Sequence, residues 1–125
     1  MLKPGGVLFS RFHLFTSDSG CHDTRIFIGQ RGELPFWAHL RPQYEQDVRT
    51  NTYLNKLRLA DWMEIFQSEM PGSEVAALCD AMDIERQELW KLRSQGQLKN
   101  YSDEELLTVT VEVNWRKPMQ SVALT

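Results

Sequence analysis

Cysteine is scarce in this sequence, and so are the features that would place a protein in a membrane or outside the cell. Cys21 and Cys79 are the only two cysteines, and their separation fits neither a zinc site nor a paired redox motif. No uninterrupted apolar run approaches membrane-spanning length. The N-terminal stretch lacks a charged region followed by an apolar core and a small-residue cleavage site. We therefore expect a cytoplasmic protein that neither binds a metal nor spans a membrane.

Basic charge is also lacking. The chain has 14 Lys and Arg against 17 Asp and Glu, a formal net charge of −3, whereas a general nucleic-acid binder would be expected to show a positive field. Hydrophobic residues at 42% and charged residues at 25% are typical of a folded globular chain. A length of 125 residues suits one domain. We expect a single soluble domain without nucleic-acid partners.

A turn and a strand are predicted near the N-terminus. Pro4-Gly5-Gly6 is a strong turn signal. In the stretch 7–14, which we expect to be a strand, apolar residues fall on both faces: Val7 and Phe9 on one, Leu8, Phe12 and Leu14 on the other. This pattern is typical of a strand covered on both sides, as in the centre of an α/β sheet.

The middle of the chain alternates loops with amphipathic segments. Residues 16–32 and the proline-bounded stretch 34–42 are predicted to be irregular. A helix is predicted over 52–69 and stopped by Pro71-Gly72, because apolar residues recur there at spacings of three and four: Leu59, Trp62, Ile65, Phe66 and Met70. A short strand at 73–79 and a surface helix at 84–95 follow.

The final segments carry the clearest local signals. Ser102-Asp103-Glu104-Glu105 has the form of a capping box and predicts one helical turn. Residues 108–115 then alternate polar and apolar side chains, with Val109, Val111, Val113 and Trp115 on one face, which predicts a strand ended by Pro118. The order of elements is that of the tail of an α/β domain.

The sequence L-K-P-G-G-V-L-F at residues 2–9 resembles the turn and fifth strand of class I S-adenosylmethionine-dependent methyltransferases. Similar segments follow in the order found in one bacterial branch of that family: P-F-W-A-H-L at 35–40, Y-L-N-K-L-R-L-A-D-W at 53–62, Y-S-D-E-E-L-L at 101–107, and a strand ending in R-K-P at 116–118. The resemblance implies that residues 1–118 form the C-terminal half of a Rossmann-like α/β sheet. We expect about three strands with two to three helices, an antiparallel last strand, and a tail at 119–125.

The cofactor-binding features of that family are missing. No glycine-rich loop follows a strand and opens a helix, and no acidic residue ends a second strand, so no residue of this chain is predicted to bind the cofactor. S-adenosylmethionine is expected only for the complete domain, and the chain alone is predicted to be inactive. A truncated gene, a misplaced start or half of a split enzyme would each give this chain. The alternative function is a non-catalytic module, or a remnant, whose exposed sheet edge binds a partner or a second copy.

The resemblance places the segment after the fifth strand on the side of the methyl acceptor, a small molecule, where α/β folds bind ligands. His22 and His39 are the predicted catalytic bases, because a base helps to remove the proton of a hydroxyl acceptor. Trp37 and Arg41 are the predicted substrate-pocket residues; Arg41 could bind a carboxylate, and Trp37 could equally anchor the loop to the core. His13, at a strand end, is interpreted as a packing residue.

Overall fold

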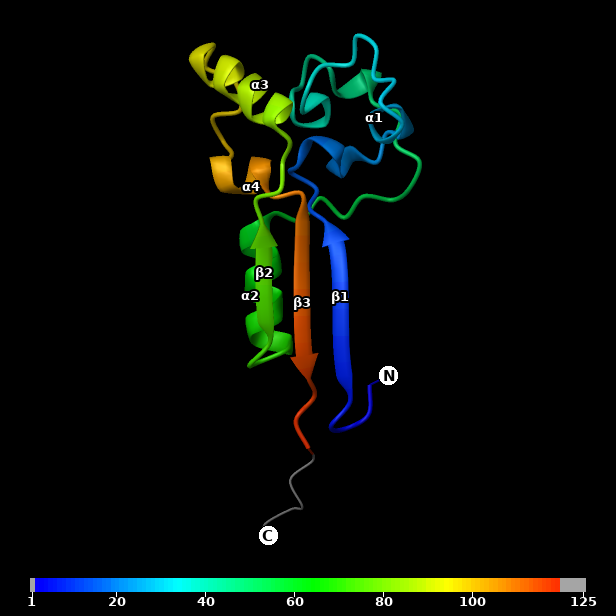
Figure 1. Cartoon of the computed structure of the whole chain (residues 1–125), viewed down its shortest axis with the longest axis vertical. Coiled ribbons are helices and arrows are strands. Elements are labelled where there is room, and N and C mark those ends of the chain that lie inside the picture. Colours follow the sequence, from blue (N-terminus) through cyan, green and yellow to red (C-terminus); the bar gives the residue numbers. More distant parts are fainter. Residues whose placement is uncertain (1, 120–125) are drawn as a thin grey trace.

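The computed structural model describes residues 2–119, and Figure 1 shows a sheet with a head of short helices and loops at one end. The sheet consists of β1 (Val7–His13), β2 (Glu74–Leu78) and β3 (Thr110–Arg116) in the order β1-β3-β2. β3 runs antiparallel to both neighbours. β1 and β2 are therefore parallel to each other, and both carboxyl ends lie at the head. The predicted α/β class and antiparallel last strand are confirmed.

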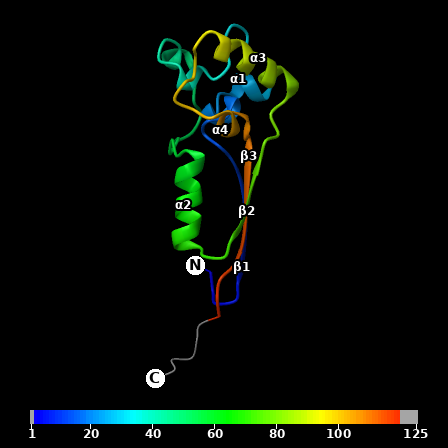
Figure 2. The same ribbon diagram turned by 90° about the vertical axis from the view of Figure 1, so that its left-hand side faces the viewer.

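Helix α2 (Leu59–Glu69) lies between β1 and β2 in the chain and covers one face of the sheet. In Figures 1 and 2 the connection β1–α2–β2 is a right-handed crossover, as parallel strands require in nearly all proteins. Apolar residues recur at spacings of three and four along α2 and its C-cap and pack on the sheet and the residue after β1: Leu59, Trp62, Phe66 and the C-cap Met70 against Leu8, Phe12, Leu14, Val75, Val111 and Val113.

The helix predicted over 52–69 begins only at Leu59, the first residue of its apolar stripe, so the predicted start at residue 52 is wrong. Asp61 accepts a hydrogen bond from the Arg58 backbone at 2.8 Å, which fixes the first turn at Leu59. Before it, Asn55 accepts from the Leu57 backbone at 3.0 Å, and Lys56 has a left-handed backbone with φ 59°. A side chain that bonds its own backbone competes with helix formation, so the chain stays irregular up to Arg58.

Within residues 2–119 nothing covers the second face of the sheet, and the prediction that both sides of β1 are covered is wrong. Val7 is 51% exposed and Phe9 62% exposed. The strand alternation points Leu8 and Phe12 towards α2, and Val7 and Phe9 to the other side. On that side Figure 2 shows no helix beside the strands, and α3 (Asp83–Ser94) lies beyond their ends in the head. Among the described strands β1 is an edge strand rather than a central one.

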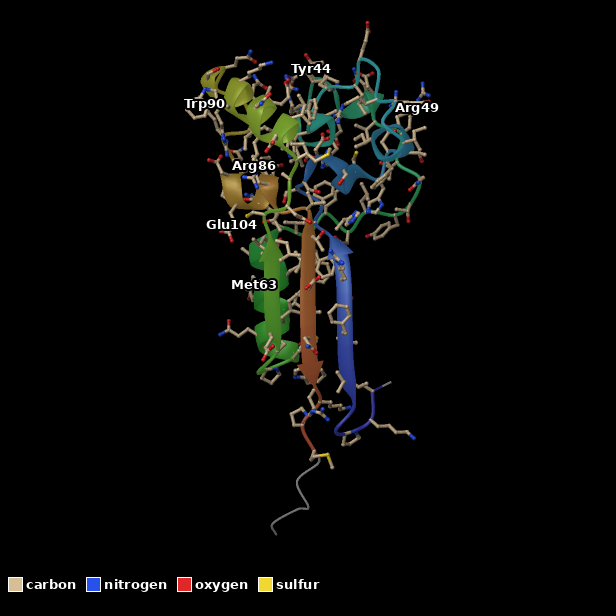
Figure 3. All side chains as sticks on the ribbon, in the orientation of Figure 1. Tyr44, Arg49, Met63, Arg86, Trp90 and Glu104 are labelled. Carbon is tan, nitrogen blue, oxygen red and sulfur yellow. The ribbon has the colours of Figure 1, made fainter. Side chains whose placement is uncertain are left out.

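The remaining helices belong to the head. The predicted surface helix is α3 (Asp83–Ser94), which buries Leu89 and Leu92 while Trp90 points into solvent, as Met63 does from α2 (Figure 3). The predicted capping box opens α4 (Asp103–Leu107). The loop at 16–32, predicted to be irregular, contains the 3₁₀ turn Asp18–Cys21 and the single-turn helix α1 (Thr24–Phe27). Further 3₁₀ turns are Ala38–Leu40 and Glu45–Asp47.

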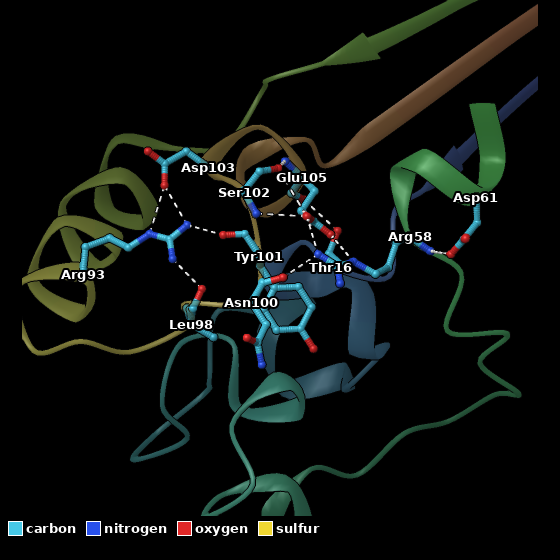
Figure 4. A network of polar contacts seen from close by, with 10 residues as sticks. All are labelled: Thr16, Arg58, Asp61, Arg93, Leu98, Asn100, Tyr101, Ser102, Asp103 and Glu105. Carbon is cyan, nitrogen blue, oxygen red and sulfur yellow. Dashed lines mark hydrogen bonds and ion pairs between the residues drawn. The ribbon is translucent and has the colours of Figure 1, made fainter. Parts of the chain in front are cut away.

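A polar network ties α2 to the head (Figure 4). Arg58 donates to both carboxylate oxygens of Glu105, at 2.8 and 2.7 Å, and to the Asn100 carbonyl at 2.6 Å. Glu105 also accepts from the Ser102 backbone at 2.9 Å, and its own carbonyl accepts from the Thr16 hydroxyl at 2.8 Å. The Glu105 carboxylate therefore fixes the start of α2 and the start of α4, and the Glu105 backbone carbonyl holds the segment after β1.

Among residues 2–119, no helix combines the length and apolar character needed to cross a membrane. The predicted tail at 119–125 lies, apart from Met119, outside the described residues.

Candidate functional site

Two of the three histidines meet at the carboxyl end of β1. His13 ends the strand, and His22 follows the 3₁₀ turn with a left-handed backbone, φ 55°. Their rings are stacked with centroids 6.4 Å apart, and the Phe27 ring lies 6.1 and 6.0 Å from them. Both histidines border a cavity of about 690 Å³ at the edge of the sheet, which Tyr53 and Trp62 also line.

His39 lies apart from this pair, beside a second cavity of about 510 Å³. Its Nε2 is 2.7 Å from the carbonyl oxygen of Phe15, and because a carbonyl only accepts, Nε2 carries the proton. Nδ1 therefore holds the lone pair, and it is buried with no hydrogen-bond partner among residues 2–119. Burial lowers the pKa of His39 below its ordinary value, so the ring is neutral at pH 7.

The two cavities are neighbours. Phe15 and Leu54 line both, and the ring of Phe15 meets the His39 ring edge to face at 5.0 Å. The structure thus places the predicted catalytic pair, His22 and His39, in adjacent cavities rather than in one.

The predicted substrate-pocket residues line neither of these cavities. Trp37 is fully buried in the head core with Leu89, Leu92, Leu98 and Leu106, and its indole donates to the Leu106 carbonyl at 3.3 Å. It occupies the anchoring position that the sequence also allowed. Arg41 is 8% exposed, donates to the Phe36 carbonyl at 3.3 Å, and stacks on the Tyr44 ring at 4.6 Å.

A buried ion pair holds the segment around Trp37 in place, and the sequence did not predict it. Asp18 is 2% exposed and accepts two hydrogen bonds from Arg31, at 2.7 and 3.0 Å. It also accepts from the Trp37 backbone at 2.7 Å, at a residue held in the left-handed region with φ 53°. This Asp18–Arg31–Trp37 clamp sets the course of the chain two residues before His39.

The thiol of Cys21 lies inside the head next to His22. Burial raises its pKa to about 11. Because the thiolate is the reactive form, we expect iodoacetamide at pH 8 to modify the exposed Cys79 and to leave Cys21 intact until the protein unfolds. Mass spectrometry of the native and urea-unfolded protein measures this, with Cys79→Ser as the matched control. Fast labelling of Cys21 in the folded Cys79→Ser variant would contradict this placement of the head.

Gly20 does not form a glycine cradle of the kind that nucleotide-type cofactors use. Gly20 is the one glycine between β1 and α1, and a Cβ there would lie 2.3 Å from the Leu14 carbonyl oxygen and 2.4 Å from that of Phe15. The space beside Gly20 is thus filled by the chain's own backbone, so the glycine serves packing and not a ligand. In the described part of the chain, no cluster of three His, Cys, Asp or Glu side chains could hold a metal ion.

Comparisons with known proteins add no relative. No protein-family model matches the chain, and searches of the curated proteins and of the solved structures find no match either.

Proposed function

We propose that this chain supplies the acceptor-side portion of an S-adenosylmethionine-dependent methyltransferase. The observation that carries the proposal is the position of His22 and His39, beyond the carboxyl ends of two parallel strands joined by a right-handed crossover. Open α/β sheets bind their ligands in this place. The family resemblance of the sequence supplies the reaction class.

The cofactor would be held by strands outside these 125 residues. The surroundings of Gly20 support this, because they leave no cradle for the cofactor. The unpaired side of β1 supports it as well, since further parallel strands could continue the sheet there.

His39 would act on the acceptor as a base. Methyl transfer is an in-line displacement in which the enzyme mainly aligns the reactants and excludes water. A hydroxyl acceptor also loses a proton, and the neutral His39 has its lone pair on Nδ1, with the ring fixed by Phe15. Because Nδ1 is buried, an acceptor reaches it through movement of the surrounding loops. His22 is only partly buried and would bind the acceptor from the adjacent cavity.

The isolated chain is expected not to bind S-adenosylmethionine, because it lacks the loop that would cradle the cofactor. Isothermal titration of the purified chain measures this directly. Micromolar affinity would show that the cofactor residues have been wrongly assigned to another segment.

A second experiment tests the reaction class. The nucleotide sequence upstream of the Met1 codon is searched for a segment that encodes a strand, a glycine-rich loop and a helix, and that segment is co-expressed with the chain. We expect the two to copurify and to bind the cofactor only together. A copurified complex without cofactor affinity would contradict the methyltransferase proposal.

A partner-binding module without catalysis is the second candidate. The uncovered face and unpaired edge of β1 favour it, since exposed strand edges pair readily with other strands.

A further inference from the structure

The outer edge of β1, by which we mean the side facing away from β3, offers a row of backbone groups that pair with no other strand in the described part of the chain. Leu14 donates to the Val109 carbonyl at 2.9 Å, so this residue and every second one before it bond to β3. The backbone groups of Val7, Phe9, Arg11 and His13 therefore point outwards. Figure 1 shows no other strand alongside them.

This edge has few of the features by which proteins usually block edge pairing. Its register with β3 is continuous over all seven residues, with no bulge and no proline. Its single charged side chain, Arg11, pairs with Glu112 on the neighbouring strand at 3.4 Å. An added strand would meet no unbalanced charge.

Apolar surface flanks the edge on both sides. Towards α2, Leu8 and Phe12 line the cavity of about 690 Å³ together with Trp62. On the other side Phe9 is 62% exposed. A strand added to β1 would bury side chains on both of its faces.

We propose that the strand added is β1 of a second copy of this chain, running antiparallel with Ser10 opposite Ser10 on a twofold axis. The sequence is self-complementary in this register. Towards α2, Leu8 of each copy meets Phe12 of the other, on either side of the small serine pair. On the open face, Phe9 of each copy meets Arg11 of the other, a cation–π pair with no like charges opposed.

The neighbouring registers are less favourable. A shift by two residues in one direction places Arg11 opposite Arg11. A shift by two in the other direction places Leu8 opposite Ser10, and Phe12 opposite Gly6. A shift by one residue places the outward-facing backbone groups of one copy opposite groups of the other copy that already bond to β3. The hydrogen bonds between the two β1 strands then cannot form. The Ser10 register alone pairs apolar residues towards α2 without opposing charges.

This inference does not depend on the proposed function. The dimer nevertheless restricts the proposed function, because a sheet that continues from β1 into cofactor-binding strands uses the same edge of β1. The dimer and the completed methyltransferase are therefore mutually exclusive.

Sedimentation equilibrium of the full chain tests the dimer. We expect a monomer–dimer equilibrium that Phe9→Lys weakens about tenfold or more, because each lysine then faces Arg11 of the other copy. Ala76→Lys is the matched control, since Ala76 lies exposed on the same face in the other edge strand, and it should leave association unchanged. A chain that stays monomeric, or a dimer that Phe9→Lys does not weaken, would overturn the proposal.

Cross-linking tests the register separately. Pairs without mutual hydrogen bonds have Cα atoms about 4.5 Å apart, within the range of a disulfide. In the Cys79→Ser background, Ser10→Cys should give a covalent dimer on mild oxidation, whereas His13→Cys should not, because the two His13 positions lie at opposite ends of the paired strands. Cross-linking through position 13 but not position 10 would exclude this register. Neither sedimentation nor cross-linking uses the cofactor, so a negative result in either contradicts the dimer and leaves the methyltransferase proposal untouched.

Discussion

Asp18→Ala is expected to lower the free energy of unfolding by about 3 kcal/mol, at the lower end of the range for a broken buried ion pair. The substitution removes the acceptor of three hydrogen bonds, two from Arg31 and one from the Trp37 backbone. The Trp37 amide is then left buried and unpaired. The loss stays at the lower end because the Arg31 side chain is 21% exposed and can regain water. Urea unfolding followed by tryptophan fluorescence measures the change.

The matched control is Asp103→Ala. Asp103 also accepts from an arginine, Arg93, at 2.9 Å, but its side chain is 71% exposed. Exposed ion pairs contribute about 1 kcal/mol or less, so this variant should remain near the parent protein. If Asp18→Ala and Asp103→Ala lower the free energy of unfolding equally, the Asp18–Arg31–Trp37 clamp does not hold the head together. The losses of Asp18→Ala and Arg31→Ala should not add in the double variant, because the two substitutions remove the same ion pair.

Most elements could be predicted from the sequence, because their causes are local. The hydrogen bond from the Glu105 backbone to the Ser102 hydroxyl lies within one turn and is visible as a four-residue motif. The strand β3 could be predicted from the alternation of valines, and two of them, Val111 and Val113, do lie against α2. The late start of α2 was missed because a periodic pattern identifies a helix face but not the capping residue that starts it.

The uncovered face of β1 could not be predicted. Val7 and Phe9 have the residue types of a buried surface, and the sequence indicates the polarity of a face without indicating what covers it. The same limit applies to the candidate site. The clamp joins Asp18 to residues 13 and 19 positions away, with no periodic signal. The orientation of His39 depends on the Phe15 carbonyl, 24 positions away in the chain.

In the completed enzyme, His39→Ala is expected to reduce turnover by about 10²–10⁴-fold, the usual loss for a positioned base, with little change in cofactor affinity. His22→Ala should likewise impair turnover more than cofactor binding, since both histidines lie on the acceptor side. Turnover is measured with radiolabelled cofactor, alongside cofactor titration and thermal unfolding of the same variants.

His39→Gln separates a base from a structural residue. The glutamine amide can still donate to the Phe15 carbonyl, but it has no basic lone pair, so thermal stability should recover while turnover stays low.

The pH dependence of stability and turnover gives a second readout. The pKa of His39 in the folded protein lies below 6.5, so folding favours the neutral ring. The free energy of unfolding therefore has its full contribution from His39 above pH 6.5, and this contribution declines as the pH falls below 6.5. The acid limb of turnover should lie in the same range, because the neutral ring is the active base. Both effects should disappear in His39→Gln. If His39→Gln restores turnover together with stability, the histidine holds the loop to Phe15 and takes no proton.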